Sequence, residues 1–452
     1  MPPALLGSLS DMLAAHTGLH FPADRWGDLE RGIAAAAPAF GMADVAACAQ
    51  RLLSAPLTHR EIEILASCLT VGETYFFREQ ASFDAVEQHV LPALLRRHEG
   101  AERRLRIWSA GCCTGEEPYS IAMLLDRLVP KTSAWPATLL ATDINPAFLR
   151  KAADGEYGEW SFRTTPGWIR ARYFQPQRGG RFKLDKRICK QVTFSYLNLA
   201  DDSYPSLTNN TNAMDVIFCR NVLMYFSAER ARTVIDNFYR ALVDGGWLIV
   251  SPAETSSVLF SRFTAVEFDG AILYRKEAGA TAPRFVSPVP SALTDAQQAP
   301  CPQALPAASP SADASAPMPA EPDQPERKAR DCANQGRLGE AAEWCRKAIA
   351  ADKLNPARHY LLSAIQQEQG QREDAAQSLA RALYLDPHFV LAHHALGHLR
   401  QSQERHNEAQ RHFDNALASL RTQPPNAILP ESDGLTAGRL VEMIESMRAS
   451  RP

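Results

Sequence analysis

The chain contains 452 residues, which is enough for about two to four domains. Its composition, 45% hydrophobic and 22% charged, is typical of a globular protein, and a formal charge of -3 excludes a general affinity for nucleic acid or anionic membrane. No apolar stretch reaches the roughly 18 residues of a membrane span, and the N-terminus lacks the features of a signal peptide. The nine scattered cysteines have no zinc-site spacing. We therefore expect a cytoplasmic protein without direct membrane insertion and without a metal centre.

Two patterns divide the first 276 residues. In residues 1–80, apolar side chains such as Ile62, Leu65 and Leu69 recur at three- and four-residue spacing, which predicts an all-α domain. In residues 81–276, β-rich runs alternate with helical stretches, which predicts an α/β domain with a mainly parallel sheet. Asp269-Gly270 predicts a hairpin between the last two strands. The expected strands are Leu105–Ala110, Thr138–Thr142, Val192–Tyr196, Asp215–Cys219, Trp247–Ser251, Phe263–Phe268 and Ala271–Arg275.

The rest of the chain has two further zones and a tail. Residues 277–324 are rich in Ala, Pro and Ser, so we expect a linker, with an ordered proline-rich ligand as the alternative. Residues 325–420 repeat with a period of 34, which is typical of tetratricopeptide repeats that bind a protein or peptide partner. Residues 421–452 are expected to form a C-terminal tail or helix. The repeated small residues are Ala341, Ala375 and Ala409, and again Ala348, Ala382 and Ala416.

The stretch RIWSAGCCTGEEPYSIAM, residues 106–123, predicts a ligand site between a strand and a helix. Gly111 would let the backbone turn tightly and approach a bound molecule closely. Two glutamates at the start of the helix would repel a pyrophosphate and suit a positively charged group, such as the ammonium and sulfonium of S-adenosylmethionine. The alternative for Glu117 is a capping box with Thr114, and the two roles are compatible.

Polar residues also follow three further strands. Asp143 is placed to accept hydrogen bonds from both ribose hydroxyls, or else to cap the helix that begins at Pro146. Asn198 and Leu199 come next, where adenine could stack on Leu199, although an Asn after a strand is usually a turn residue. Because the carboxyl ends of parallel strands meet at one edge of the sheet, we expect these groups to converge. The fourth strand is followed by Arg220, Asn221 and Tyr225, for which the alternative is a strand-capping Arg and a core Tyr.

These stretches resemble the CheR family of chemoreceptor glutamate methyltransferases over roughly residues 1–276. The resemblance implies a Rossmann-like class I methyltransferase domain with an all-α N-terminal domain and a small antiparallel β-subdomain within about residues 165–192. It implies S-adenosyl-L-methionine as the cofactor, S-adenosyl-L-homocysteine as the product, and the cytoplasmic domain of a methyl-accepting chemoreceptor as the partner. The matching stretches are TVGETYFFRE (71–80), WSAGCCTGEEPYSIAM (108–123), ATDINPAFLRKA (141–152), LNL (197–199) and DVIFCRNVLMYF (215–226).

The resemblance also implies roles for single residues. Glu117 would take the amino end of the methionine moiety and Asp143 the ribose, while Arg220 and Tyr225 would lie near the methyl group. The implied catalytic set is Arg220, Tyr225 and Arg78. The implied cofactor-binding set is Thr74, Arg78, Gly111, Glu117, Asp143, Asn198, Leu199, Arg220 and Asn221.

Two departures from the family pattern have consequences. Gly72 stands where family members often have Asn, so one polar contact is lost there. The loop PQRGGRF is about three residues shorter than in members that dock on a receptor's C-terminal pentapeptide, so we expect no such tether and propose that the repeats replace it. The architecture, including the ending LPESDGLTAGRLVEMI, resembles the WspC branch of the family, which is linked to surface sensing and biofilm signalling.

The expected chemistry is an in-line methyl transfer to a glutamate side chain. With a reference pKa of about 4.3, that side chain is already a carboxylate in the cytosol, so no general base is needed and the protein's task is positioning. Two alternatives stay open. The chain could bind S-adenosylmethionine as a sensor or scaffold without receptor methylation, or it could methylate another substrate.

Overall fold

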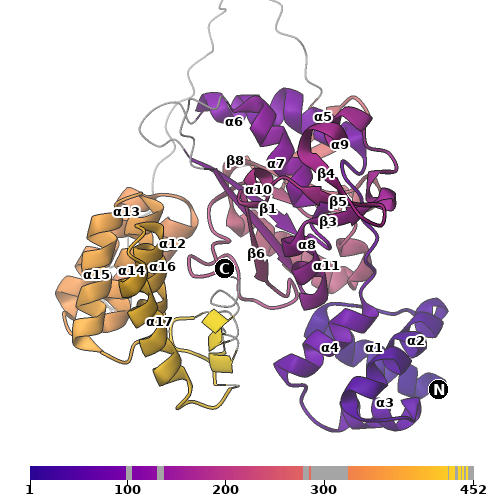
Figure 1. The fold of residues 1–452 in the computed structure, drawn as a ribbon, viewed down its shortest axis with the longest axis horizontal. Helices are drawn as coiled ribbons and strands as arrows, with labels where there is room; N and C mark the ends of the chain where they lie inside the picture. Colours follow the sequence, from indigo (N-terminus) through magenta and orange to yellow (C-terminus); the bar gives the residue numbers. More distant parts are fainter. Residues whose placement is uncertain are drawn as a thin grey trace, which may run out of the picture.

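The computed structural model shows three parts in chain order: a helical N-terminal domain, an α/β domain and a helical C-terminal module (Figure 1). It describes residues 1–97, 104–129, 137–277, 285–286, 324–425, 427–432, 436–438, 440–441 and 444–445. The predicted fold class is confirmed. No single helix among these residues has the length and apolar character of a membrane span, although the bent pair Ala23–Phe40 and Val45–Ser54, at 79°, passes on length and composition.

The N-terminal domain packs its helices around a core of leucine and isoleucine side chains. Leu65 and Leu69 are buried as their spacing predicted, whereas Ile62 is half-buried. A capping box between Thr58 and Glu61 starts α4. Gly32 lies where α2 crosses α4, because a Cβ there would stand 2.3 Å from Leu69 Cδ2. The elements are α1 (Pro3–Thr17), η1 (Ala23–Arg25), α2 (Trp26–Ala36), η2 (Ala37–Phe40), α3 (Val45–Ser54) and α4 (His59–Leu69).

The α/β domain is built on an eight-stranded sheet of order β11-β9-β10-β8-β7-β1-β2-β6. The strands from β8 to β6 run parallel, and β10 joins antiparallel to both β8 and β9, so the predicted hairpin at one side of a parallel sheet is confirmed. All seven expected strands form, with ends shifted by a few residues. Their bounds are β1 (Leu105–Ala110), β2 (Ala137–Asp143), β6 (Val192–Tyr196), β7 (Met214–Phe218), β8 (Leu242–Ile249), β9 (Thr264–Phe268), β10 (Ala271–Arg275) and β11 (Phe285–Val286).

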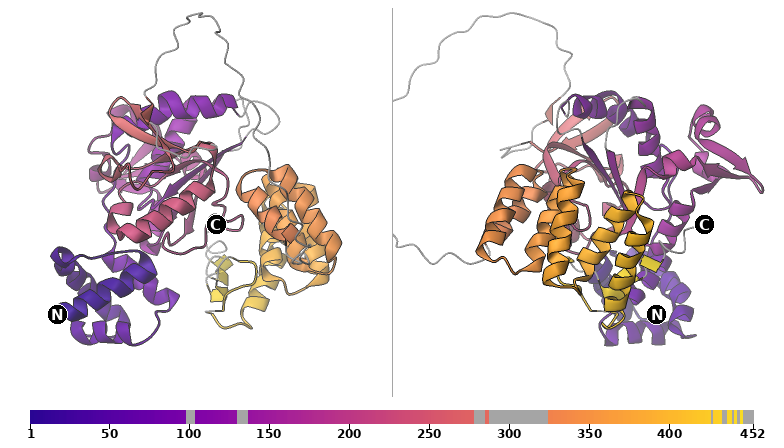
Figure 2. Two further views of the ribbon diagram at one scale, coloured as in Figure 1. Left: turned by 180° about the vertical axis from the view of Figure 1, so that it is seen from behind. Right: turned by 60° about the vertical axis from the view of Figure 1, so that its left-hand side comes forward.

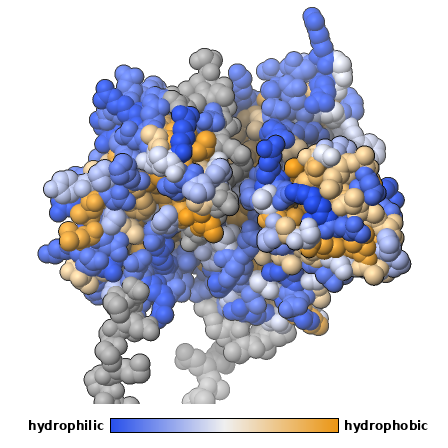
Figure 3. All heavy atoms as spheres, turned by 90° about the horizontal axis from the view of Figure 1, so that it is seen from below, coloured by the Kyte–Doolittle hydropathy of each residue, from blue (hydrophilic) through white to orange (hydrophobic). Residues whose placement is uncertain are grey.

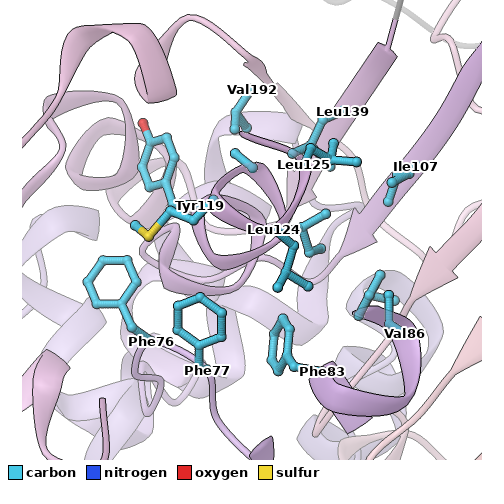
Figure 4. Packing of buried hydrophobic residues seen from close by; sticks show 14 of the residues in the cluster. Phe76, Phe77, Phe83, Val86, Ile107, Tyr119, Leu124, Leu125, Leu139 and Val192 are labelled. Atoms are coloured by element: carbon cyan, nitrogen blue, oxygen red, sulfur yellow. The ribbon is translucent and has the colours of Figure 1, made fainter. Parts of the chain in front are cut away.

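Helices cover both faces of this sheet because successive side chains of each strand point to opposite sides. On β1, Ile107 belongs to one buried apolar cluster and Trp108 to the other. Figure 4 shows the first cluster, where Leu124 of α7 lies close to Phe83. The helical elements are α5 (Gln80–Ala85), the π-helical η3 (Val86–Val90), α6 (Leu91–Arg97), α7 (Glu116–Leu128), α8 (Pro146–Asp154), η4 (Glu159–Phe162), α9 (Gly167–Tyr173), α10 (Lys186–Cys189), η5 (Leu223–Tyr225), α11 (Ala228–Ala241) and η6 (Pro252–Glu254).

A second, three-stranded antiparallel sheet has the order β3-β5-β4. Its strands are β3 (Glu156–Gly158), β4 (Phe174–Gln177) and β5 (Arg181–Leu184). The sheet therefore begins earlier than the range 165–192 expected from the sequence, because β3 pairs with β5 across helix α9. Gly179 and Gly180, with φ of 73° and 69°, close the short hairpin between β4 and β5.

The C-terminal module consists of three helical hairpins, and the predicted repeat architecture is confirmed. All six spaced alanines are buried at the contacts between helices. Gly397 lets α16 approach α17 closely, because a Cβ there would lie 2.6 Å from the ring of Phe413. The helices are α12 (Gln324–Asn334), α13 (Leu338–Ala351), α14 (Pro356–Glu368), α15 (Arg372–Leu385), α16 (Val390–Ser402) and α17 (His406–Leu420). Most of the expected linker lies outside the described residues, except that Phe285–Val286 forms β11 beside β9.

The repeat module docks on the α/β domain at the amino ends of the sheet strands (Figure 2). Arg106, which is 4% exposed, donates to Glu368 of α14 at 2.6 Å and to the carbonyl of Asn212 at 3.1 Å. Ala213 N also donates to Asn334 O at 3.2 Å. Seen from below, hydrophobic residues gather in patches on both the left and the right of the view, separated by hydrophilic ones (Figure 3). Because Arg106 is buried in this interface, its bond to Glu368 holds the repeat module in place on the α/β domain.

We expect the substitution Glu368→Ala to loosen this interface. It would leave the buried Arg106 guanidinium without its carboxylate, which should lower the free energy of unfolding by about 3 kcal/mol. Small-angle scattering should then give a larger radius of gyration. Glu373→Ala, at an exposed position on the neighbouring helix α15, is the matched control and should leave both quantities unchanged. An unchanged radius of gyration for Glu368→Ala would contradict the expectation.

Candidate active site

A cavity lies at the carboxyl ends of β1, β2, β6 and β7, between the α/β domain and the N-terminal domain. This is the edge of a doubly wound sheet where ligands bind. The sequence placed its candidates at these strand ends, and the structure brings them together. The residues that line the cavity include Thr74, Arg78, Gly111, Glu117, Asp143, Asn198, Leu199, Arg220, Asn221 and Tyr225.

The turn after β1 brings main chain up to the cavity. Gly111 has a φ of 79°, and a Cβ there would lie 2.4 Å from Val222 Cγ2 on the loop after β7. The amides of Gly111 and Cys112 donate to Thr142 O at 2.8 and 2.9 Å, which fixes the turn against β2. Both a left-handed backbone and a close approach thus require glycine at position 111.

The two glutamates that begin α7 have different environments. Glu117 turns into the cavity, where it accepts from Ser109 Oγ at 2.8 Å and from Arg220 Nη1 at 3.2 Å. Glu116 turns away and accepts from Thr114 Oγ1 at 2.6 Å. The capping box expected between Thr114 and Glu117 does not form, and the N-cap of α7 is Gly115 with no side-chain cap. Only Glu117 of the two glutamates faces the cavity, because consecutive helical residues point about 100° apart.

The second negative charge comes from Glu79 instead. Arg220 donates through Nη2 to Glu79 at 2.8 Å and to the carbonyl of Arg78, while its Nη1 bonds Glu117. Two carboxylates therefore surround one guanidinium, which leaves net negative charge at this wall of the cavity. Burial is the main cause that raises the pKa of Glu117, and the charge of Arg220 opposes it. Arg220 Nε is buried without a partner among the described residues.

Asp143 ends β2 and lines the cavity. Its carboxylate accepts from the amides of Cys113 and Asn145, each at 2.8 Å. The cap of α8 is Asn145, whose side chain accepts from two amides of the first turn, so the alternative role of Asp143 as that cap is wrong. Burial raises the pKa of Asp143 to about 6. The carboxylate is thus held in place by main-chain donors at the site where the sequence predicted the ribose.

This pKa leads to a pH-dependent binding prediction. Below pH 6 the free protein holds a proton on Asp143, and donation from ribose hydroxyls would favour the charged form. Binding then releases the proton, so affinity falls as the pH drops through 6 and should be about tenfold weaker at pH 5 than at pH 7.5. Calorimetry with S-adenosylhomocysteine measures this. Asp143→Asn should bind weakly and lose most of the dependence, whereas a flat profile for the native chain would contradict the role of Asp143.

Asn198 and Leu199 lie where the N-terminal domain meets the sheet. The Asn198 amide donates to His16 O at 2.7 Å and to Asp201 at 2.9 Å, so it links the end of α1 to the loop after β6. Leu199 is 7% exposed and lines the cavity beside it. The Asn198 side chain is therefore hydrogen-bonded to other protein groups, and Leu199 gives the cavity an apolar surface.

The loop with Thr74 and Arg78 forms another wall. Arg78 Nη1 donates to Glu73 O at 2.7 Å, and both Thr74 and Arg78 line the cavity. At Gly72 a Cβ would lie 2.9 Å from Phe148 Cζ, so the ring of Phe148 fills the space beside that glycine. An aromatic side chain that also lines the cavity thus fills the space where a side chain at position 72 would lie.

Residues 17–25 of the N-terminal domain supply a wall that the sequence gave no sign of. His20 N donates to Tyr225 O at 2.8 Å, and Leu19 pairs with Phe226 as an antiparallel bridge. Arg25 stands 5.5 Å from the centre of the Tyr225 ring and lines the cavity. These contacts join segments far apart in the chain, and periodicity carries no information about such pairs. They enclose the cavity at Tyr225.

Glu254 organises the loop after β7 and was also missed. Its carboxylate accepts from the amides of Asn221 at 2.7 Å and Val222 at 2.8 Å, and from Ser251 Oγ at 2.8 Å. Asn221 itself is left-handed, with a φ of 58°. The pattern Ser251-x-x-Glu254 is a capping box that the structure contains, so it could have been recognised in the sequence.

The residues present fit S-adenosylmethionine. The net negative wall at Glu79 and Glu117 suits its positively charged groups, and the unpartnered Arg220 Nε offers a donor beside that wall. Asp143 offers carboxylate oxygens for the ribose, at the place where open α/β sheets bind nucleotides. A parallel sheet closed by an antiparallel hairpin, with this cavity at its carboxyl edge, defines the class of S-adenosylmethionine-dependent methyltransferases.

Comparisons with known proteins name the family. Residues 72–271 match "CheR methyltransferase, SAM binding domain", and residues 392–428 match "Tetratricopeptide repeat". Chemotaxis protein methyltransferase 2 of Vibrio cholerae is 35% identical over 216 residues, 48% of this chain and 73% of that protein. Chemotaxis protein methyltransferase 1 of Pseudomonas aeruginosa is 36% identical over 219 residues, 47% of this chain and 77% of that protein. The chain belongs to the CheR methyltransferase family, and S-adenosylmethionine is its cofactor.

One relative resembles the chain beyond the methyltransferase domain. The probable biofilm formation methyltransferase WspC of Pseudomonas aeruginosa is 30% identical over 358 residues, which are 75% of this chain and 81% of that protein. The chain is therefore a WspC-like member of the CheR family with C-terminal tetratricopeptide repeats.

Proposed function

We propose that this protein transfers the methyl group of S-adenosylmethionine to glutamate side chains in the cytoplasmic domain of a methyl-accepting chemoreceptor. The products are glutamate methyl esters and S-adenosylhomocysteine, and the reaction serves chemosensory signalling in surface sensing and biofilm formation. The observation that supports this best is a single cavity lined by all ten sequence-predicted residues and enclosed by the N-terminal domain. The names of the relatives support the substrate class. The site of action we propose is the cytoplasm.

The geometry suits a reaction controlled by positioning. A glutamate carboxylate needs no base, so the site has to exclude water and align the carboxylate oxygen with the methyl carbon and the sulfur. Because Glu79 and Glu117 already neutralise Arg220, that guanidinium would hold the site's shape without binding a substrate carboxylate too tightly. Arg78 lines the mouth of the same cavity and is proposed to orient the substrate carboxylate.

Tyr225 is the group proposed to stand nearest the methyl group. Its hydroxyl has no hydrogen-bond partner among the described residues, while its ring is held between the N-terminal domain and the loop after β7. The hydroxyl is thus available to the reacting groups. Tyr225→Phe should lower the methylation rate about tenfold to a hundredfold without lowering cofactor affinity, because it removes one hydrogen bond made in the transition state.

The decisive experiment uses cofactor labelled with tritium in the methyl group. Label should pass to the cytoplasmic domains of methyl-accepting receptors from the same organism and be released as methanol in alkali, as a methyl ester requires. Receptor variants with Gln at the acceptor positions should take up no label. Alkali-stable label would show a different substrate chemistry, and cofactor binding without any transfer would show a sensor or scaffold; either result would overturn the proposal.

A further inference from the structure

The loop between α4 and α5, residues 70–79, carries two residues that line the cavity, Thr74 and Arg78. These ten residues form no helix or strand. Phe77 and Glu79 have φ of 55° and 58°, a left-handed backbone that residues other than glycine keep only where their surroundings hold them. The positions of Thr74 and Arg78 therefore depend on the elements packed around the loop.

The segment between β3 and α9, residues 159–165, holds the middle of this loop. Phe76 N donates to Ser161 O at 2.9 Å, and Thr165 Oγ1 donates to Phe76 O at 3.1 Å. The buried Phe76 ring also stacks on Phe162, with ring centroids 5.1 Å apart. Both polar backbone groups of Phe76 and its side chain are thus fixed to the part of the chain that joins β3 to the rest of the small antiparallel sheet.

Arg163 of the same segment reaches the loop at two further points. Its guanidinium forms an ion pair with the carboxylate of Glu73, and its Cζ lies 3.7 Å from the centre of the Tyr75 ring. Nη1 of Arg163 donates to Trp160 O at 2.8 Å, and Cζ lies 4.5 Å from the centre of the Trp160 ring. The Arg163 side chain is only 19% exposed, so its guanidinium is held between its own segment and the loop.

Glu73 and Tyr75 in turn contact Arg78. Arg78 Nη1 donates to the carbonyl of Glu73 at 2.7 Å, and Arg78 Cζ lies 5.8 Å from the centre of the Tyr75 ring. Arg163 and Arg78 are therefore connected through the same two residues. Glu73, Tyr75 and Arg78 line the cavity, whereas Arg163 stands outside it. The placement of Arg78 at the cavity thus depends on a residue that a bound cofactor does not touch.

We propose that Arg163 is a positioning residue for methyl transfer. It holds Glu73 and Tyr75 in place, and through them it sets the position of the Arg78 guanidinium at the cavity. The inference rests on the proposed function, in which Arg78 orients the substrate carboxylate. Loss of Arg163 should therefore affect transfer more than cofactor binding, because alignment of the reacting atoms tolerates less displacement than binding does.

The test compares Arg163→Met with Arg170→Met in the full chain. Arg170 pairs with Glu159 at 2.7 Å and lies 4.9 Å from the centre of the Phe182 ring, so it makes the same kinds of contact with partners outside the loop. We expect Arg163→Met to lower the methylation rate at saturating S-adenosylmethionine about tenfold to a hundredfold, and to raise the dissociation constant of S-adenosylhomocysteine less than about threefold. Arg170→Met should change neither quantity.

A double variant separates positioning from stability. If Arg163 acts through Arg78, Arg163→Met should lower the rate by less than about twofold in a chain that already carries Arg78→Met. Arg163→Lys is included in case Arg163→Met does not fold. It keeps the charge beside Glu73 but loses the planar group on Tyr75, so it should fold and lower the rate about threefold to tenfold.

Three results would overturn the proposal. The first is a native methylation rate in Arg163→Met or Arg163→Lys, and the second is an undiminished effect of Arg163→Met in the Arg78→Met chain. In both cases the native chain transfers methyl groups to the receptor, so the proposed function stands and only the role of Arg163 is wrong. The third is a native chain that transfers no methyl group, which contradicts the proposed function and the role of Arg163 with it.

Discussion

Replacing Arg220 with methionine is expected to lower the affinity for S-adenosylmethionine at least a hundredfold. Arg220 is 6% exposed and is the only cation bonded to both Glu79 and Glu117 among the described residues. Methionine keeps much of the volume but leaves two carboxylates together at the cavity wall without a cation between them, which removes the charge pattern that suits the cofactor. Breaking such a buried pair should also lower the free energy of unfolding by about 3–5 kcal/mol.

Calorimetry with S-adenosylhomocysteine and thermal unfolding measure the two effects. Arg262→Met is the matched control, because Arg262 pairs with Asp236 at 2.9 Å on an exposed surface. Its loss should cost less than about 1 kcal/mol and leave cofactor binding unchanged. Arg220→Lys is included in case Arg220→Met does not fold. It retains the charge but cannot bond both carboxylates at once, so it should fold and still bind the cofactor weakly. Native affinity in Arg220→Lys would show that simultaneous bonds to Glu79 and Glu117 are not needed for cofactor binding.

The sequence predicted the strands and repeats because their signals are local and periodic. Runs such as Leu105–Ala110 are buried along their whole length, and the alanines at a period of 34 mark each helix contact. The site residues could be predicted for a topological reason. Asp143 and Arg220 both follow parallel strands, and parallel strands end at a common edge. Residues that are far apart in the sequence therefore become neighbours when their strands end at the same edge of the sheet.

The remaining features depend on partners that no local pattern specifies. Glu116 and Glu117 are adjacent in the chain, and only the positions of Ser109 and Arg220 decide that Glu117 faces the cavity. Glu79 enters the network from a separate loop, at a left-handed backbone position with a φ of 58°. Arg25 reaches Tyr225 from another domain. Each of these is a tertiary contact between segments distant in sequence.

The N-terminal domain and the repeats meet the α/β domain at opposite edges of its sheet. Asn198 and Tyr225 join the N-terminal domain at the carboxyl edge, next to the cavity. Arg106 joins the repeats at the amino edge. The repeats therefore lie on the far side of the sheet from the cavity, and none of their described residues lines it.

Glu254→Gln is the second change with a large expected effect, although Glu254 does not line the cavity. Its carboxylate accepts from three amides of the loop, those of Asn221, Val222 and Met224 at 2.7, 2.8 and 3.2 Å. In glutamine an NH2 group replaces one oxygen and faces amide donors, so at least one buried amide loses its acceptor at a cost of about 1–3 kcal/mol. The left-handed conformation of Asn221 then loses its support, and Arg220 and Tyr225 at either end of the loop move.

Since Glu254 acts through the loop, the change should weaken both binding and turnover. We expect the dissociation constant of S-adenosylhomocysteine to rise about tenfold and the methylation rate at saturating cofactor to fall about a hundredfold, because alignment of the reacting atoms is more sensitive to displacement than binding is. Glu267→Gln, at an exposed position on β9, makes the same chemical change in the same domain and should alter neither quantity. A purely structural role would instead lower the melting temperature of Glu254→Gln while leaving both constants native below that temperature. That outcome would show that Glu254 stabilises the fold and that other residues position Arg220 and Tyr225.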